Sequence, residues 1–180
     1  MDHEEYYSRY DNLSHMIRRA YTMLYSIEAI GDSGTPTLNP FNAVGYIDMI
    51  LRYMLGLTIC EICYDSNRKA NTIPRLHNWI NGGDAETPII PIRDALKTDL
   101  TDLRNQYLAH NDKKKREDVK IPIDDMGCLL NELRKWLNSL CRPDLDSRVS
   151  EITDDESEAR KKVVYAGFRS LLDGKSRVEE

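Results

Sequence analysis

The sequence has few residues that break helices, with nine glycines and seven prolines among 180 residues. It also lacks an excess of basic residues: the formal net charge is -5, which argues against coating nucleic acid through bulk electrostatics. Any nucleic-acid contact should therefore be local. The amino end lacks a secretory signal, and no apolar run approaches the roughly 20 residues of a membrane span. We therefore expect a cytoplasmic protein with no membrane segment.

The four cysteines, Cys60, Cys63, Cys128 and Cys141, occur in stretches typical of helices or helix ends. A secreted disulfide framework would instead tie loops together, so this pattern favours reduced thiols. Cys60 and Cys63 share one helical face, and His77 or Cys128 could complete a zinc site with them. Buried thiols are the simpler interpretation, because a second paired cysteine spacing is missing. We predict no metal and no cofactor.

Apolar residues recur at intervals of three and four along most of the chain, which is the pattern of amphipathic helices. Thr72 and Pro74 predict the start of a short helix that ends at Gly82. No stretch alternates apolar and polar residues long enough for a sheet. We therefore predict an all-α fold, an antiparallel bundle of four to five main helices. The long helices are expected at about 6–27, 44–65, 92–107 and 124–140.

The segment Arg142-Pro143-Asp144 interrupts the helical pattern, and the residues after it are rich in charge. We predict a helical bundle over residues 1–141 and a charged C-terminal extension over 142–180. A modest apolar stripe predicts a helix in the extension, packed on the bundle or on a partner. The stripe consists of Val164, Phe168, Leu171 and Leu172.

Residues suited to phosphodiester chemistry gather near the end of the third long helix. Arg104 and His110 fan across roughly 120° of that predicted helix, with Tyr107 between them. RNA cleavage by attack of its own 2′-hydroxyl needs a proton acceptor, a proton donor and a cation where negative charge accumulates. Histidine titrates near neutrality and arginine binds phosphate through a planar fork. A basic run follows, Lys113, Lys114, Lys115 and Arg116.

This segment resembles the HEPN superfamily, in which an arginine, a polar residue, a few further residues and a histidine follow one another near the end of a bundle helix. The ending from Arg104 to Asp112 is most similar to its abortive-infection branch. The segments 61–65 and 72–76 are also similar to that branch. The likeness covers approximately residues 1–140.

The resemblance implies a helical bundle that forms a homodimer and, in active members, a metal-independent endoribonuclease. Such a hydrolase would serve a toxin-antitoxin, abortive-infection or antiviral defence system, with RNA as substrate and an antitoxin or regulatory protein as a further partner. Arg104 and His110 would be the catalytic core, and Asn105 fits the polar position that follows the arginine. A related toxin group carries a nucleotide-accepting tyrosine two residues after the histidine. Asp112 stands there, so we do not expect that regulation.

Simpler interpretations stand beside this one. His110 could cap the last helical turn while Arg104 pairs with a nearby carboxylate, in a catalytically silent HEPN bundle for dimerisation and for partner or nucleotide binding. The motif could also be accidental, in a structural helical adaptor. The basic run 113–116, together with Tyr107, is assigned to RNA binding, and the alternative for the run is a solvated loop.

Overall fold

The computed structural model describes residues 2–34, 42–64, 71–82, 100 and 123–175. In these ranges every regular element is a helix, which confirms the predicted all-α bundle. The helix expected at about 92–107 lies outside the described residues except for Leu100. The described helices are α1 (His3–Asp32), α2 (Ala43–Tyr64), α3 (Ile73–Asn81), α5 (Ile123–Ser139) and α6 (Asp154–Lys175).

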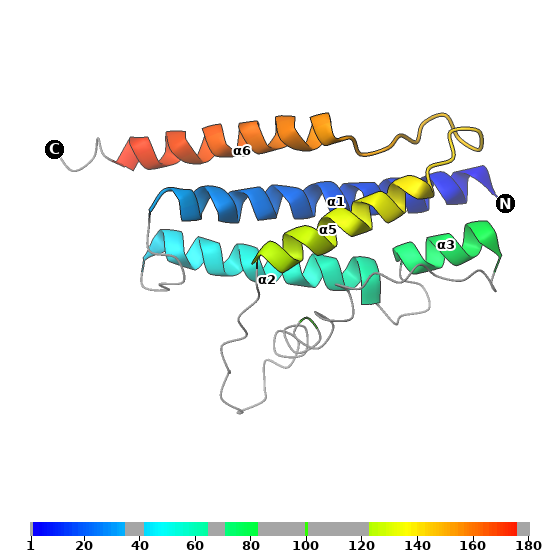
Figure 1. Cartoon of the computed structure of the whole chain (residues 1–180), viewed down its shortest axis with the longest axis horizontal. Coiled ribbons are helices and arrows are strands. Elements are labelled where there is room, and N and C mark those ends of the chain that lie inside the picture. The colour runs from blue at the N-terminus through cyan, green and yellow to red at the C-terminus, as the bar shows by residue number, and fades with distance from the viewer. Residues whose placement is uncertain (1, 35–41, 65–70, 83–99, 101–122, 176–180) are drawn as a thin grey trace, which may run out of the picture.

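Helix α1 is the centre of the described bundle and contacts α2, α3, α5 and α6 (Figure 1). It lies between α2 and α6, while α5 crosses the bundle obliquely. Helices α2 and α5 run antiparallel to α1, as expected, whereas α6 runs parallel to it. The connection from α5 returns beside the first half of α1, so α6 begins next to Arg18 and ends beyond Asp32.

The long α1 follows from its cap and from its apolar stripe. The Asp2 side chain accepts a hydrogen bond from the backbone N–H of Glu4 at 3.0 Å, and acidic residues in the first turn favour this helix end. The stripe predicted from the sequence is buried throughout its length, which confirms it. Its members are Tyr6, Tyr10, Leu13, Ile17, Tyr21, Leu24 and Ile27.

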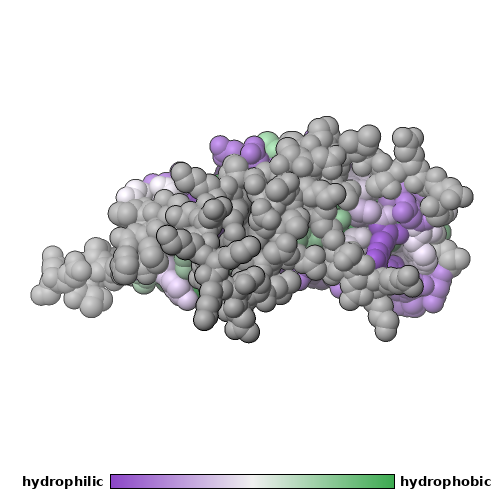
Figure 2. Space-filling view, turned by 90° about the horizontal axis from the view of Figure 1, so that it is seen from below, coloured by the Kyte–Doolittle hydropathy of each residue, from purple (hydrophilic) through white to green (hydrophobic). Residues whose placement is uncertain are grey.

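Helix α3 begins and ends where the sequence predicts. The Thr72 hydroxyl accepts a hydrogen bond from the backbone N–H of Arg75 at 3.4 Å, and Gly82 has a φ of 87° that favours glycine. Ile73 and Leu76 are fully buried. Hydrophilic residues gather at the end of the molecule that carries α3 (Figure 2). This short helix is therefore amphipathic, with its apolar side toward the core.

The core continues past residue 141. Val149 is 6% exposed and Ile152 is 1% exposed. The Asn138 amide of α5 donates to the Ile152 carbonyl at 3.1 Å and accepts from the Ile152 N–H at 3.0 Å. Arg134 also donates to that carbonyl, at 3.3 Å. The start of the predicted extension is therefore held against α5, while the division between 1–141 and 142–180 stays a prediction.

The helix predicted in the extension is confirmed as α6, and it is attached through both apolar and polar side chains. Val164 of the predicted stripe and Tyr165 are partly buried against the core. No α6 side chain that the structure describes is buried, and Leu171 of the predicted stripe is 68% exposed. Tyr165 donates a hydrogen bond to Asp32 at 3.0 Å. Two ion pairs accompany it, Arg18 with Glu156 at 2.6 Å and Lys161 with Glu28 at 2.9 Å.

Helix α2 is long and mostly apolar. By length and composition, Ala43–Cys63 could cross a membrane, since it has 21 residues and a mean hydropathy of 1.4. Asp48 and Arg52 interrupt the apolar residues of this segment. These two side chains pair with each other at 2.9 Å. Core helices of soluble proteins meet the same criterion, and α2 packs against α1.

Candidate functional site

The predicted catalytic and RNA-binding residues lie outside the described residues. They are Arg104, Asn105, Tyr107, His110, Lys113, Lys114, Lys115 and Arg116. Leu100, on the same predicted stripe, is described and fully buried. Its carbonyl accepts a hydrogen bond from the Cys60 thiol at 3.4 Å. The stripe that leads to Arg104 therefore has one confirmed core position, packed beside α2.

The residues considered for a zinc site do not form one group. Cys60 and Cys63 are buried, whereas Cys128 is exposed. The Nδ1 atom of His77 accepts a hydrogen bond from the Trp136 indole N–H at 3.2 Å, which joins α3 to α5. In the part of the chain that the structure describes, no three His, Cys, Asp or Glu side chains are grouped for a metal ion.

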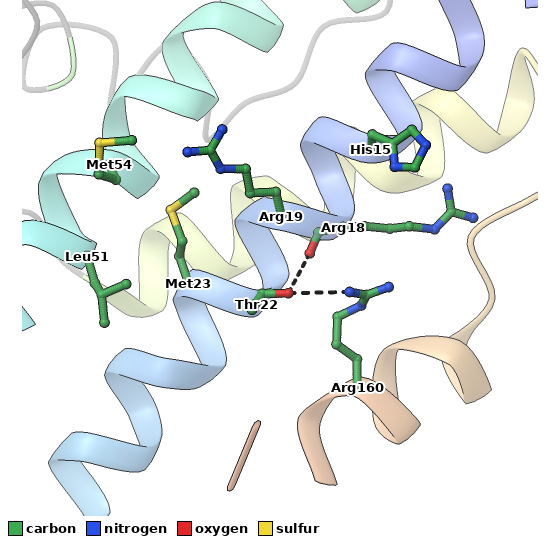
Figure 3. Close-up of a pocket in the computed structure, with 8 residues that line it drawn as sticks. All are labelled: His15, Arg18, Arg19, Thr22, Met23, Leu51, Met54 and Arg160. Carbon is green, nitrogen blue, oxygen red and sulfur yellow. Dashed lines mark hydrogen bonds between the residues drawn. The ribbon is translucent and has the colours of Figure 1, made fainter. Parts of the chain in front are cut away.

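The described residues form a basic groove that the sequence interpretation did not include (Figure 3). The groove has a volume of about 680 Å³. Its floor is one face of α1, and its walls come from α2 and from α6. The floor residues are His15, Arg18, Arg19, Thr22 and Met23, and the wall residues are Leu51 and Met54 from α2 and Arg160 from α6.

Charges on the α6 side of the basic groove are partly paired. Glu156 receives hydrogen bonds from Arg18 at 2.6 and 3.2 Å and from Arg160 at 3.3 Å. The hydrogen bond from Arg18 is the main reason that the pKa of Glu156 lies below its ordinary value. Arg160 also lies 3.4 Å from the Thr22 hydroxyl, which itself donates to the Arg18 carbonyl. One carboxylate thus bridges two arginines across the α1–α6 boundary.

The α2 side of the basic groove places an arginine next to apolar surface. Arg18 extends to the same side of α1 as Arg160, whereas Arg19 extends toward α2 (Figure 3). Arg19 is exposed and forms no hydrogen bond or ion pair with any residue that the structure describes. Met23, Leu51 and Met54 border it. The groove therefore offers positive charge next to a wall of aliphatic and thioether groups.

A signal for this groove is present in the sequence. His15, Arg19 and Thr22 follow one another at intervals of four and three, on the side of α1 away from the apolar stripe. This periodicity predicts the core side of α1. It does not pair the polar side with Arg160, because that residue lies 138 positions beyond Thr22.

Comparison of the chain with protein-family models, with curated proteins and with solved structures found no match. The class of protein that the structure defines is accordingly an all-α helical bundle.

Proposed function

We propose that the chain is a HEPN-type endoribonuclease that cleaves RNA with Arg104 and His110 and needs no metal ion. The observation that carries this proposal is the sequence from Arg104 to Asp112, with its arginine, polar residue and histidine in the order of that superfamily. Two findings support it. A helical bundle is the architecture that the resemblance implies, and Leu100 is buried as the predicted stripe requires.

The proposed reaction uses the RNA's own nucleophile. His110 takes the proton of the 2′-hydroxyl, and the 2′-oxygen bonds to phosphorus as the bond from phosphorus to the 5′-oxygen breaks. A protonated imidazole then gives a proton to the departing 5′-oxygen. Arg104 stabilises the negative charge that accumulates on the phosphorane. The products are a 2′,3′-cyclic phosphate and a 5′-hydroxyl.

The residues around this pair have supporting roles in the proposal. Asn105 orients a catalytic side chain or contacts the ribose. Tyr107 stacks on a base, and the basic run 113–116 holds backbone phosphates. RNA supplies the nucleophile and the imidazole transfers the protons. The reaction therefore proceeds without metal-bound water.

Incubating the purified protein with mixed RNA and a chelator tests the proposal. We expect cleavage to persist, with 2′,3′-cyclic phosphate ends, and to be lost in His110→Ala and Arg104→Ala. Asn105→Ala should be milder. Arg169→Ala, at an exposed position of α6, is the matched arginine control and should cleave normally.

Three other results would contradict the proposal. Activity that disappears with the chelator and returns with Mg²⁺ would exclude the metal-free mechanism. Variants whose activity loss tracks their unfolded fraction would favour a capping role for His110. A folded wild-type protein that cleaves no RNA would favour the non-catalytic HEPN module.

We further propose that the protein acts in the cytoplasm as a homodimer, within a toxin-antitoxin, abortive-infection or antiviral defence system. The resemblance implies that the Arg104–His110 segments of two protomers share one cleft. Light scattering on the purified protein should then give twice the chain mass of 20.8 kDa. A monomer at assay concentration would contradict the shared cleft.

A further inference from the structure

A hydrogen bond between two rings joins α3 to the last turns of α5 (Figure 1). The Trp136 indole N–H donates to His77 Nδ1 at 3.2 Å, and the ring centres lie 5.7 Å apart at an interplanar angle of 61°. Trp136 is buried and His77 is half-buried. An indole N–H can only donate, so His77 Nδ1 must accept with a free lone pair. The contact therefore requires a neutral imidazole with its proton on Nε2.

We propose that this contact is an acid-sensitive switch: α3 is docked on α5 at neutral pH, and its C-terminal half is released when the His77 ring takes up a second proton. Histidine is the side chain whose charge ordinarily changes between about pH 5 and 8. Mild acid should therefore operate the switch. The inference goes beyond the proposed ribonuclease activity and uses none of the residues assigned to it.

Protonation removes the acceptor on which the contact depends. An imidazolium ring has two N–H donors and no acceptor, so the Trp136 N–H would face another N–H. The edge of an aromatic ring is also its positive part, which repels an added positive charge. A buried donor without a partner costs free energy, and water can satisfy both groups once the helix moves away. Acid therefore favours the released position of α3.

The charged groups around α3 do not offset a positive charge on His77. No carboxylate that the structure describes forms an ion pair with His77, and Arg75 is the other ionisable residue of α3. Two carboxylates on neighbouring helices are already paired, Glu5 with Arg9 at 2.8 Å and Glu132 with Lys135 at 2.7 Å. The last turn of α2 contributes an exposed carboxylate. The groups on the packed helices are Glu5 and Arg9 of α1, Glu61 of α2, and Glu132 and Lys135 of α5.

The two halves of α3 are attached differently. The helix has nine residues, and an isolated helix of that length is not stable in water, so α3 depends on docking. Its first half is anchored by Ile73 and Leu76, which are fully buried. Its second half is held through His77 and through half-buried Trp79, whose ring centre lies 5.8 Å from the Arg9 guanidinium. Loss of the contact with α5 should therefore loosen the second half and leave the first in place.

Tryptophan fluorescence of the full chain tests the switch. The chain has two tryptophans, so Trp79→Phe leaves Trp136 as the reporter. Titration from about pH 8 to about pH 5 should give one transition, with emission at longer wavelength in acid as Trp136 meets water. Adding His77→Gln should abolish the transition, because glutamine supplies an oxygen acceptor that does not titrate. His15→Gln removes an exposed histidine of α1 and is the matched control, which should keep the transition.

Hydrogen exchange locates the movement. After correction for intrinsic rates, protection of the amides at 77–81 relative to those of α5 should be lower at about pH 5.5 than at about pH 7.5. The expected loss is up to roughly tenfold, the scale of one net hydrogen bond. His77→Gln should show the same protection at both pH values. A loss of protection in the wild type that is equal at both ends of α3 and throughout α5 would indicate general acid unfolding and overturn the inference.

Nitrogen NMR of the wild-type chain tests the same contact without a substitution in α3. At neutral pH the His77 ring should carry its proton on Nε2, and the Trp136 indole resonance should shift together with that ring as the pH falls. A proton on Nδ1 at neutral pH would overturn the inference. So would a fluorescence transition that persists in His77→Gln, or a folded wild-type chain with no transition. Arg104→Ala/His110→Ala should keep the transition, so failure of the ribonuclease proposal is distinguishable from failure of this one.

Discussion

The Tyr6 hydroxyl donates a hydrogen bond to the carbonyl oxygen of Leu140 at 3.0 Å. The same hydroxyl accepts one from the backbone N–H of Arg142 at 2.7 Å. A side chain in the first turns of α1 thus satisfies two backbone groups just beyond the C-terminal end of α5, where intrahelical partners run out. Because Tyr6 is fully buried, water cannot replace it at this position.

Tyr6→Phe should therefore destabilise the fold. The substitution keeps the ring but leaves two backbone groups without their partner, at a cost of about 1 to 3 kcal/mol. Urea denaturation followed by circular dichroism measures this loss. Tyr7→Phe is the matched control, since the Tyr7 ring contacts the Arg148 guanidinium at 3.9 Å and its hydroxyl has no hydrogen bond among the described residues. Equal losses in both variants would contradict the bridging role of Tyr6.

Buried tyrosines on α1 should make the protein sensitive to alkali. Burial raises the pKa of Tyr6 and that of Tyr21 from 10.0 to about 12. Below pH 10 both tyrosines are neutral in the folded and unfolded states, and the full stability is present. Above pH 10 the unfolded chain loses these protons first, so the free energy of unfolding should fall as the pH rises toward 12.

Each of these two tyrosines contributes up to about 3 kcal/mol to that fall. Melting temperatures recorded across the alkaline range measure it. Tyr21→Phe removes one of the titrating groups, so its melting temperature should decline less steeply than that of the wild type. Identical slopes for the two proteins would show that other groups control the alkaline loss.

Two truncations should have different effects. A chain ending at Thr153 loses α6, in which no described side chain is buried, and it should still melt cooperatively. A chain ending at Asp144 also loses Val149 and Ile152, each worth about 1.5 to 3 kcal/mol of burial. Its denaturation midpoint should therefore be clearly lower. Equal midpoints for the two truncated chains would mean that Val149 and Ile152 contribute little to the core.

The helices could be predicted from the sequence because their causes are local. The apolar intervals from Tyr6 to Ile27 give α1, and the Thr72 cap with Gly82 bounds α3. The parallel course of α6 could not be predicted. It depends on polar pairs such as Arg18 with Glu156, which are 138 residues apart in the sequence. The spacing of apolar residues gives no information about such pairs.

The candidate functional residues likewise include some that the sequence predicts and some that only the fold brings together. Arg104 and His110 were found through a motif, and the structure describes only Leu100 near them, buried as the stripe predicts. The basic groove was missed because Arg160 joins Thr22 and Arg18 only in the folded chain. Polar residues on the outer face of a helix usually face solvent. Here they line a groove only because α6 packs beside α1.

The hydrogen bonds at the start of α1 also determine when the fold can be completed during synthesis. Tyr6 and Tyr10 need partners at Leu140 and Ser150, which are 134 and 140 residues later in the chain. At ribosomal rates of roughly 5 to 20 residues per second, on the order of 10 s pass between synthesis of the first turns of α1 and synthesis of these partners. The hydrogen bonds of both hydroxyl groups can therefore form only after residue 150 has been synthesised.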